Sequence, residues 1–189
     1  LQMSIYASTK LATETIAHSY SHIWNTPTTV LRFFTVYGPW GRPDMALFKF
    51  TKSILEGKKI DIYNKGNLYR DFTYIDDIVH GVSLLIKKIP KYKKNASLNR
   101  IDSLSPVAPF RIVNIGNSKK IRLLDFIKTI ENSLGKKALK NYMPMQKGDV
   151  FKTLANTKLL KKITGFVPKI NYKEGVRNFV EWYLDYYKK

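Results

Sequence analysis

The stretch LRFFTVYGPWGRPDMALFKF, residues 31–50, carries the pattern that decides the fold class. It overlaps the segment TTVLRFF (Thr28–Phe34), which is apolar and β-branched, as expected for a buried parallel strand. The glycines and prolines of YGPWGRPD then predict a loop. MALFKFTKSILEG (Met45–Gly57) follows with helical periodicity and a terminal glycine. A buried strand followed by a loop and a helix is a unit of an α/β fold.

The flanking segments continue this alternation. Upstream, a serine cap predicts a helix from Ser4 to Trp24. Downstream, short strands are expected at 59–63 and 70–75 around the turn NKGN, and another strand at 110–116. Further helices are expected over residues 76–88, 122–135, 156–164 and 172–187, with a polar surface loop at 89–109. We therefore expect an α/β chain with some parallel strand pairing.

Composition limits the protein's class. The 189 residues are 44% hydrophobic, which is enough for one good-sized domain or parts of two. No run of about 18 apolar residues exists, so we expect no membrane span, and the absence of a signal-like core predicts a cytoplasmic protein. The chain has no cysteine, which excludes disulfides and thiolate metal sites. His18 and His22 are four residues apart, but without an intervening HExxH glutamate we interpret them as a helix-surface pair, and we expect no metal site.

The charge of the chain is strongly positive. Lysine and arginine total 33 against 14 aspartates and glutamates, a formal charge of +19. Lysine dominates and is scattered along the chain, without the interleaved aromatic side chains of a base-stacking surface. We therefore expect no nucleic-acid partner, although the positive field favours capture of an anionic small molecule.

Tyr6 and Lys10 form the first candidate catalytic pair. A spacing of four residues places both side chains on one face of a helix, and an ammonium beside a phenol favours the phenolate. Such a pair suits proton transfer in nicotinamide chemistry. The same spacing also fits an ordinary exposed helix pair. A dinucleotide fold further requires a glycine-rich turn between a strand and a helix, and no G-x-G-x-x-G array is present in the chain.

A series of sequence blocks occurs in order: SIYASTKLATE, LRFFTVYGPWGRPDMALFKFTKSILEG, YRDFTYIDDIVHGV, VNIGNS and MPMQKGDV. The series resembles the NAD-dependent nucleotide-sugar epimerases and dehydratases of the extended short-chain dehydrogenase/reductase superfamily. Within it, the blocks are most similar to UDP-glucuronate 4-epimerases of capsule and surface-polysaccharide pathways, and the likeness extends through nearly the whole chain. Galactose epimerases and sugar 4,6-dehydratases generally have asparagine where this chain has Thr35.

The resemblance implies a domain organisation. The chain would hold the C-terminal part of a Rossmann-like doubly wound parallel sheet and a small α/β substrate-binding domain. Residues 1–45 would be the last helix–strand unit of the NAD-binding domain. Residues 46–189 would be mostly the UDP-sugar domain, with segments at about 70–90 and 110–116 returning to the Rossmann part. The glycine-rich NAD loop would belong to an N-terminal half that is missing here.

The resemblance also assigns residues at the reaction centre. Tyr6 would remove the proton of the sugar 4-hydroxyl, and Lys10 would hold the nicotinamide ribose, with Phe33 also at the cofactor. Thr35 and Arg42 would hold the sugar carboxylate, since arginine binds carboxylates through two parallel hydrogen bonds. The alternative for Arg42 is that it only pins its own loop.

The remaining implied contacts belong to UDP. Ala46 and Leu47 would offer backbone N–H groups to the diphosphate at a helix N-terminus. Asp61 and Tyr63 would frame the uracil, Arg70 would meet a phosphate, and Gln146 and Asp149 would contact the ribose or phosphate region. The alternatives are ordinary strand positions for Asp61 and Tyr63 and an ion pair between Arg70 and Asp149. Asp76 and Asp77 are expected to cap their helix.

The implied function is C4 inversion of a UDP-hexuronic acid by transient oxidation to a 4-keto sugar, with NAD as cofactor and a homodimer as the family's assembly. The fragment alone is expected to be inactive and not to hold NAD. Two alternatives stay open. One is a UDP-glucuronate decarboxylase or sugar 4,6-dehydratase activity, and the other is a non-catalytic remnant that binds UDP-sugars or pairs with another subunit.

Overall fold

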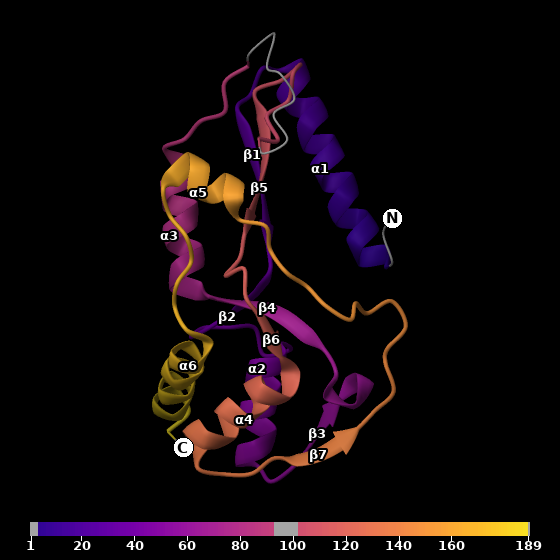
Figure 1. Cartoon of the computed structure of the whole chain (residues 1–189), viewed down its shortest axis with the longest axis vertical. Coiled ribbons are helices and arrows are strands. Elements are labelled where there is room, and N and C mark those ends of the chain that lie inside the picture. Colours follow the sequence, from indigo (N-terminus) through magenta and orange to yellow (C-terminus); the bar gives the residue numbers. More distant parts are fainter. Residues whose placement is uncertain (1–3, 93–101, 189) are drawn as a thin grey trace.

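The computed structural model describes residues 4–92 and 102–188. Helices and strands alternate along the chain, so the α/β class is confirmed (Figure 1). The helices are α1 (Ile5–Ile23), α2 (Ala46–Leu55), α3 (Ile75–Ile86), α4 (Leu123–Leu134), α5 (Lys158–Thr164) and α6 (Tyr172–Tyr186), with a 3₁₀ turn η1 (Tyr63–Gly66). The strands are β1 (Thr28–Phe33), β2 (Thr35–Tyr37), β3 (Lys59–Ile62), β4 (Tyr69–Tyr74), β5 (Phe110–Ile115), β6 (Lys120–Arg122) and β7 (Leu139–Tyr142).

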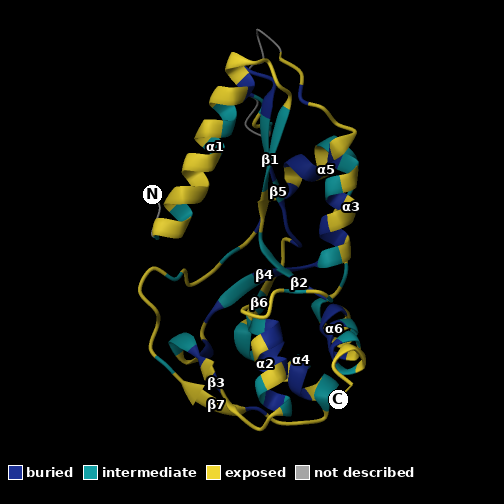
Figure 2. Cartoon of the chain, turned by 180° about the vertical axis from the view of Figure 1, so that it is seen from behind, coloured by how far each residue is buried: buried dark blue, intermediate teal, exposed yellow. Residues whose placement is uncertain are grey.

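One end of the molecule is built on the parallel pair β1–β5, in which Thr28 lies opposite Phe110 and Phe33 opposite Ile115. Helix α1 lies along one side of this pair, and α3 and α5 lie along the other (Figures 1 and 2). Val113, Ile115 and Leu160 are fully buried between the strands and α3 and α5. Continuous apolar strands covered on both faces are typical of parallel sheets.

The other end has a larger core. Strand β4 pairs in parallel with β2 and antiparallel with β6, and β3 pairs in parallel with β7. Helices α2, α4 and α6 gather around these strands (Figure 1). Phe72 and Phe126 stack in the centre with ring centroids 3.9 Å apart, and Phe179 is 1% exposed. This packing fixes β4 and α2 against each other, and both contribute to the site described below.

The predicted helices are present with small shifts at their ends. Ser4 caps α1 as expected, because its hydroxyl accepts a hydrogen bond from the Ala7 amide at 3.2 Å. Gly57 follows α2 with φ +65°, and Gly135 closes α4 in the left-handed conformation that glycine adopts without strain. Among residues 4–92 and 102–188, no helix is long and apolar enough to cross a bilayer.

The predicted strands are present, and three further strands are found in the described ranges. β1 covers the segment expected at 28–34 and ends at Phe33. The strands on either side of NKGN pair with other strands, β3 with β7 and β4 with β2 and β6. Strands β2, β6 and β7 were not predicted. The loop expected at 89–109 ends at β5 as predicted, although its residues 93–101 lie outside the described part. The proposed domain boundaries remain predictions.

Two buried carboxylates join the two ends of the molecule. Asp71 of β4 is fully buried and accepts hydrogen bonds from the amides of Asn117, Ser118 and Ala155, each at 2.9 Å. Asp77 accepts from the amides of Lys169 and Ile170 at 2.9 and 2.8 Å. The sequence predicted that Asp76 and Asp77 cap α3, and this prediction is wrong. The N-cap residue is Tyr74, without a side-chain hydrogen bond, and the Asp77 carboxylate accepts from amides of a distant segment instead.

Candidate functional site

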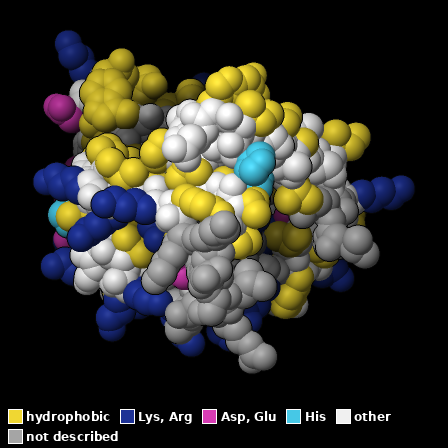
Figure 3. All heavy atoms as spheres, turned by 90° about the horizontal axis from the view of Figure 1, so that it is seen from above, with side chains coloured by type: hydrophobic (Ala, Val, Ile, Leu, Met, Phe, Trp, Pro, Cys, Tyr) yellow, Lys and Arg dark blue, Asp and Glu magenta, His cyan; other side chains and the backbone are white. Residues whose placement is uncertain are grey.

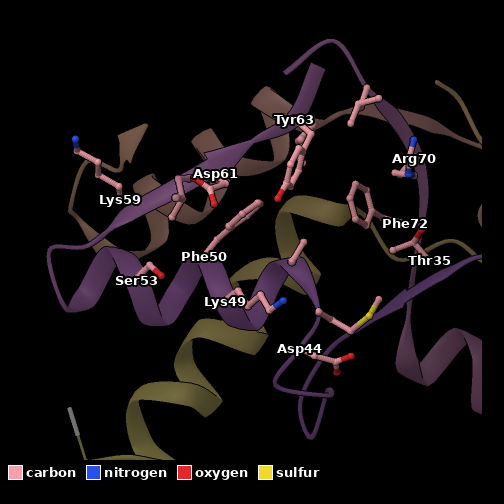
Figure 4. Close-up of a pocket in the computed structure, with 15 residues that line it drawn as sticks. Thr35, Asp44, Lys49, Phe50, Ser53, Lys59, Asp61, Tyr63, Arg70 and Phe72 are labelled. Carbon is pink, nitrogen blue, oxygen red and sulfur yellow. The ribbon is translucent and has the colours of Figure 1, made fainter. Parts of the chain in front are cut away.

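A cavity of about 500 Å³ opens between α2, β3 and β4. Phe50 and Tyr63 reach into it from opposite sides, with Thr35 and Arg70 toward one end and Lys59 toward the other (Figure 4). Its walls mix apolar and charged side chains: Thr35, Asp44, Met45, Ala46, Lys49, Phe50, Ser53, Lys59, Ile60, Asp61, Tyr63, Leu68, Arg70, Phe72 and Leu123. The volume and the few polar groups are typical of small-molecule sites.

Helix α2 presents one face to the cavity. Ala46, Lys49, Phe50 and Ser53 line the wall, and their spacing of three, four and seven residues is that of one helix face. The neighbouring face of the helix carries Leu47 and Ile54, which are buried. Met45 precedes the helix without a side-chain cap, so the first amides of α2 are open to an anion at this end.

Strand β3 and η1 form the far wall. Ile60 and Ile62 are buried while Lys59 and Asp61 alternate with them on the exposed face. The Asp61 carboxylate accepts a hydrogen bond from the side-chain Nδ2 of Asn141 at 2.7 Å, across the β3–β7 pair. Tyr63 then turns into the cavity at the start of η1 (Figure 4). Both predicted uracil-site residues thus line the cavity.

Arg70 reaches the cavity from β4. Its Nη2 donates to Asp149 Oδ1 at 2.7 Å, and the two side chains are 18% and 29% exposed. The segment that carries Asp149 is tied to β4 by hydrogen bonds from the Tyr69 amide to Phe151 O at 3.0 Å and from the Thr153 amide to Tyr69 O at 3.1 Å. The ion pair left open by the sequence is therefore present. It brings Asp149 to the rim of the cavity while Gln146 stays exposed.

A smaller cavity of about 50 Å³ adjoins the first, and both are lined by Thr35, Met45 and Ala46. Arg42 and Leu47 line the smaller one, so the two residues expected at the sugar carboxylate, Thr35 and Arg42, share a wall. Arg42 makes a two-point ion pair with Asp44. This hydrogen-bonded pairing raises the pKa of Arg42 and lowers the pKa of Asp44.

Tyr6 and Lys10 line neither cavity and are exposed at the N-terminal end of α1. The Lys10 ammonium is 5.5 Å from the centre of the Tyr6 ring, which confirms the predicted side-by-side placement and falls within cation–π range. Tyr6 is 71% exposed, and Phe33 at the end of β1 is 49% exposed. The structure thus brings together most of the predicted UDP and sugar contacts. It leaves Tyr6, Lys10, Phe33 and Gln146 open to solvent.

Several lining residues were not predicted from the sequence. Lys49, Phe50 and Ser53 were identifiable in principle, since they repeat at helical spacing from Ala46. Lys59 lies two residues before Asp61 on the same strand face. Asn141 carried no signal, because its strand β7 was not predicted and its contact with Asp61 spans 80 residues.

His18 and His22 each have a hydrogen-bond partner outside α1. His18 Nε2 lies 2.8 Å from the Ser105 hydroxyl, and His22 Nδ1 lies 2.7 Å from the carbonyl oxygen of Val107. Each ring therefore ties α1 to the segment before β5. No cluster of metal-ligating side chains is found within the described ranges.

A family model described as "NAD dependent epimerase/dehydratase family" matches residues 2–99, more than half of the chain. The chain belongs to the NAD-dependent epimerase/dehydratase family. This epimerase/dehydratase chain is 54% identical over 187 residues to Protein CapI of Staphylococcus aureus, covering 99% of this chain and 56% of the relative. It is 49% identical over 189 residues to a probable UDP-glucuronate 4-epimerase of Rhizobium meliloti, covering 99% of this chain and 55% of the relative.

A solved structure gives the same result for the fold. UDP-glucuronic acid 4-epimerase from Bacillus cereus, in complex with UDP-glucuronic acid and NAD, superposes with a TM-score of 0.83 at 30% identity. The match covers 99% of this chain and 55% of that enzyme. The epimerase/dehydratase chain therefore has a Rossmann-like epimerase architecture, and it spans about half the length of the curated relatives it matches.

A bound NAD would need a cradle for its pyrophosphate. A dinucleotide pyrophosphate requires glycines where the ligand approaches the backbone, in a G-x-G-x-x-G array that this sequence does not contain. A Cβ at Gly38, Gly66 or Gly116 would meet Ile75, Leu124 or Ala155 within 2.6 Å, so these three glycines make room for the chain's own side chains. None of the three therefore provides a pyrophosphate cradle. Lys10, which the sequence resemblance places at the nicotinamide ribose, is exposed on α1.

Proposed function

We propose that this chain is the sugar-nucleotide half of a UDP-glucuronate 4-epimerase, an enzyme that inverts C4 of a UDP-hexuronic acid through a 4-keto sugar. One observation carries the proposal. Ala46, Asp61, Tyr63 and Arg70, each expected at UDP, come from separate segments and line the same cavity. The named relatives and the Bacillus cereus enzyme support the choice of substrate.

UDP binding follows from the chemistry of the cavity walls. The amides at the start of α2 and the Arg70 guanidinium are groups that hold phosphate oxygens. Tyr63 and Phe50 offer aromatic surfaces for a flat base at the other side (Figure 4). We place the diphosphate at Ala46, Leu47 and Arg70 and the uracil at Asp61 and Tyr63. Asp149 orients Arg70, and Gln146 belongs to the ribose side.

The sugar carboxylate would lie at the smaller cavity. A 4-keto uronic acid is a β-keto acid and loses carbon dioxide readily, so an epimerase must hold its carboxylate in a poorly aligned position. Arg42 offers paired N–H donors and Thr35 a hydroxyl on the same wall. Their shared placement supports epimerisation over decarboxylation as the outcome.

Proton transfer would be the task of α1. Tyr6 accepts the proton of the 4-hydroxyl, and the neighbouring Lys10 ammonium favours the phenolate that does so. In the completed fold, Phe33 and Lys10 would hold the nicotinamide end of NAD, and the cofactor would supply the reversible hydride exchange at C4 that inversion requires.

We expect the 189-residue chain alone to be inactive, because it lacks the pyrophosphate cradle. In the completed enzyme, α1 would also contribute to a homodimer. Its apolar side chains Ile16, Tyr20 and Ile23 are between 58% and 64% exposed, which supports a partner on this face (Figure 2). A cytoplasmic location and a role in capsule synthesis stay predictions. The absence of a nucleic-acid partner also stays a prediction. On the face in Figure 3, Lys and Arg side chains lie mainly around the edge.

The test compares the chain with a completed enzyme. The purified chain is incubated with UDP-glucuronate and NAD, alone and fused to the part of the Bacillus cereus enzyme that the match does not cover. We expect UDP-galacturonate only from the fusion, with Tyr6→Phe lowering turnover by about 100-fold or more and Tyr20→Phe on the same helix leaving it unchanged. Turnover by the isolated chain, or a fully active Tyr6→Phe fusion, would overturn the proposal.

A further inference from the structure

Arg42 is already engaged by a carboxylate of its own loop. Its Nε donates to Asp44 Oδ1 at 3.0 Å, and its Nη2 donates to Asp44 Oδ2. This two-point arrangement is the one that arginine makes with any carboxylate, including that of an acidic sugar. Asp44 thus stands where a substrate carboxylate would stand relative to the guanidinium.

The pair lies at the junction of the two cavities. Asp44 lines the larger cavity and Arg42 the smaller, and Thr35, Met45 and Ala46 line both. A UDP-sugar whose diphosphate lies at the start of α2 brings its sugar to this junction. Both partners of the ion pair are therefore within reach of the sugar.

Another carboxylate can also replace Asp44 in its ion pair with Arg42. The Arg42 and Asp44 side chains are 75% and 55% exposed. Within the described part of the chain, neither side chain has a hydrogen bond to a third residue. Exposed ion pairs contribute little to stability, so another carboxylate can displace Asp44 at small cost.

We propose that Asp44 competes with the substrate carboxylate for Arg42 and so limits the site's preference for acidic over neutral sugar nucleotides. The inference rests on the proposed function, in which Arg42 holds the sugar carboxylate. A uronic acid must displace Asp44 from Nη2 or share that nitrogen beside a like charge, and both weaken its binding. A neutral sugar makes no such contact, so Asp44 leaves its binding unchanged.

The experiment is a double-mutant cycle on the 189-residue chain, using calorimetry with UDP-glucuronate and UDP-glucose. The quantity compared is the ratio of the two dissociation constants, because any effect on the UDP part that both nucleotides share cancels in this ratio. The Arg42→Ala background then separates competition for Arg42 from direct repulsion between Asp44 and the sugar carboxylate. We expect Asp44→Asn to raise the preference for UDP-glucuronate by about two- to fivefold, the scale of an exposed ion pair. In an Arg42→Ala background, Asp44→Asn should leave the ratio unchanged.

The outcomes separate this inference from the proposed function. An unchanged or lowered ratio for Asp44→Asn overturns the competition, and a lowered one shows that Asp44 pre-orients Arg42 instead. An equal rise in the Arg42→Ala background also overturns it. If Arg42→Ala itself leaves the ratio unchanged, or the chain binds neither nucleotide, the proposed function fails and the inference fails with it. Far-ultraviolet circular dichroism confirms that each variant keeps its fold.

Discussion

The Arg70 guanidinium lies 2.7 Å from the Asp149 carboxylate, and the pair joins β4 to the segment that follows β7. Arg70 lines the cavity while Asp149 does not, so Asp149 restricts the side chain of Arg70 at the cavity's edge. A restricted guanidinium loses less conformational freedom when it binds a phosphate.

Arg70→Ala should weaken UDP binding by the chain about 10- to 100-fold, because it removes a charge-assisted hydrogen bond to phosphate. Isothermal calorimetry with UDP measures the effect. Arg111→Ala is the matched control, since Arg111 pairs with Asp102 at 3.0 Å in another part of the chain. Equal affinities for the Arg70→Ala and Arg111→Ala variants would remove Arg70 from the UDP site.

The hydrogen bonds that Asp71 accepts lead to a prediction about the free energy of unfolding. Asp71→Ala leaves the amides of Ser118 and Ala155 without their acceptor and the Asn117 amide with only the Thr73 hydroxyl, which should lower the free energy of unfolding by about 3 kcal/mol or more. Urea denaturation measures the change. Asp125→Ala, at an exposed position of α4, should stay within about 0.5 kcal/mol of the parent chain. Similar losses in the two variants would contradict the role of Asp71 as a buried acceptor.

The sequence predicted the helices well because their signals are local. The Ser4 cap and the glycines after α2 and α4 act within a few residues of the helix ends they define. Strand pairing depends on distant partners instead. The sequence predicted strands on both sides of NKGN but not their partners. In the structure Asn64 and Lys65 adopt left-handed conformations in η1, and β3 and β4 join separate sheets. No nearby residue indicates that β3 pairs with residues 139–142.

The difference between local signals and long-range contacts also applies to the site. The resemblance identified Thr35, Asp61, Tyr63 and Arg70, and the structure collects all four at one cavity. Their roles stay predictions. The contacts of Arg42 with Asp44 and of Asp61 with Asn141 appear only in three dimensions, since neither partner carries a motif of its own. Asp77 was wrongly predicted to cap α3. Its amide partners lie more than 90 residues away, so no local sequence signal indicates them.

The ratio of UDP-pentose to UDP-galacturonate formed by the fusion enzyme tests the carboxylate contacts. Arg42→Ala should raise the fraction of UDP-pentose formed from UDP-glucuronate, because the 4-keto acid is then free to align its carboxylate for loss of carbon dioxide. Mass spectrometry of the products measures the fraction. Arg32→Ala serves as the control, since Arg32 pairs with Glu14 of α1. An unchanged pentose fraction in the Arg42→Ala variant would exclude Arg42 as the group that holds the carboxylate.

The lowered pKa of Glu131 predicts that the free energy of unfolding depends on pH. Burial favours its neutral form, but hydrogen bonds from the Lys140 ammonium at 2.5 Å and the Ala138 amide at 2.9 Å outweigh it, and the pKa of Glu131 is lowered. A lowered pKa in the folded state means that the carboxylate stabilises the fold above the usual glutamate pKa. That contribution is lost as the pH falls through the folded-state value.

Glu131→Gln should therefore lower the free energy of unfolding by about 1 to 3 kcal/mol near neutral pH, and the difference from the parent should shrink as the pH falls toward about 3. Denaturation at a series of pH values measures it. Asp125→Asn, at an exposed carboxylate of the same helix, controls for removal of a charge. A difference that stays constant across the series would show that packing rather than charge explains the Glu131→Gln effect.

In our proposal, this chain carries the nucleotide-sugar site without a cradle for the pyrophosphate of NAD. The decisive measurement is calorimetric titration of the 189-residue protein with UDP and, separately, with NAD. We expect saturable binding of UDP that Arg70→Ala weakens, and no measurable binding of NAD. Tight binding of NAD by the chain alone, or failure to bind UDP, would contradict it.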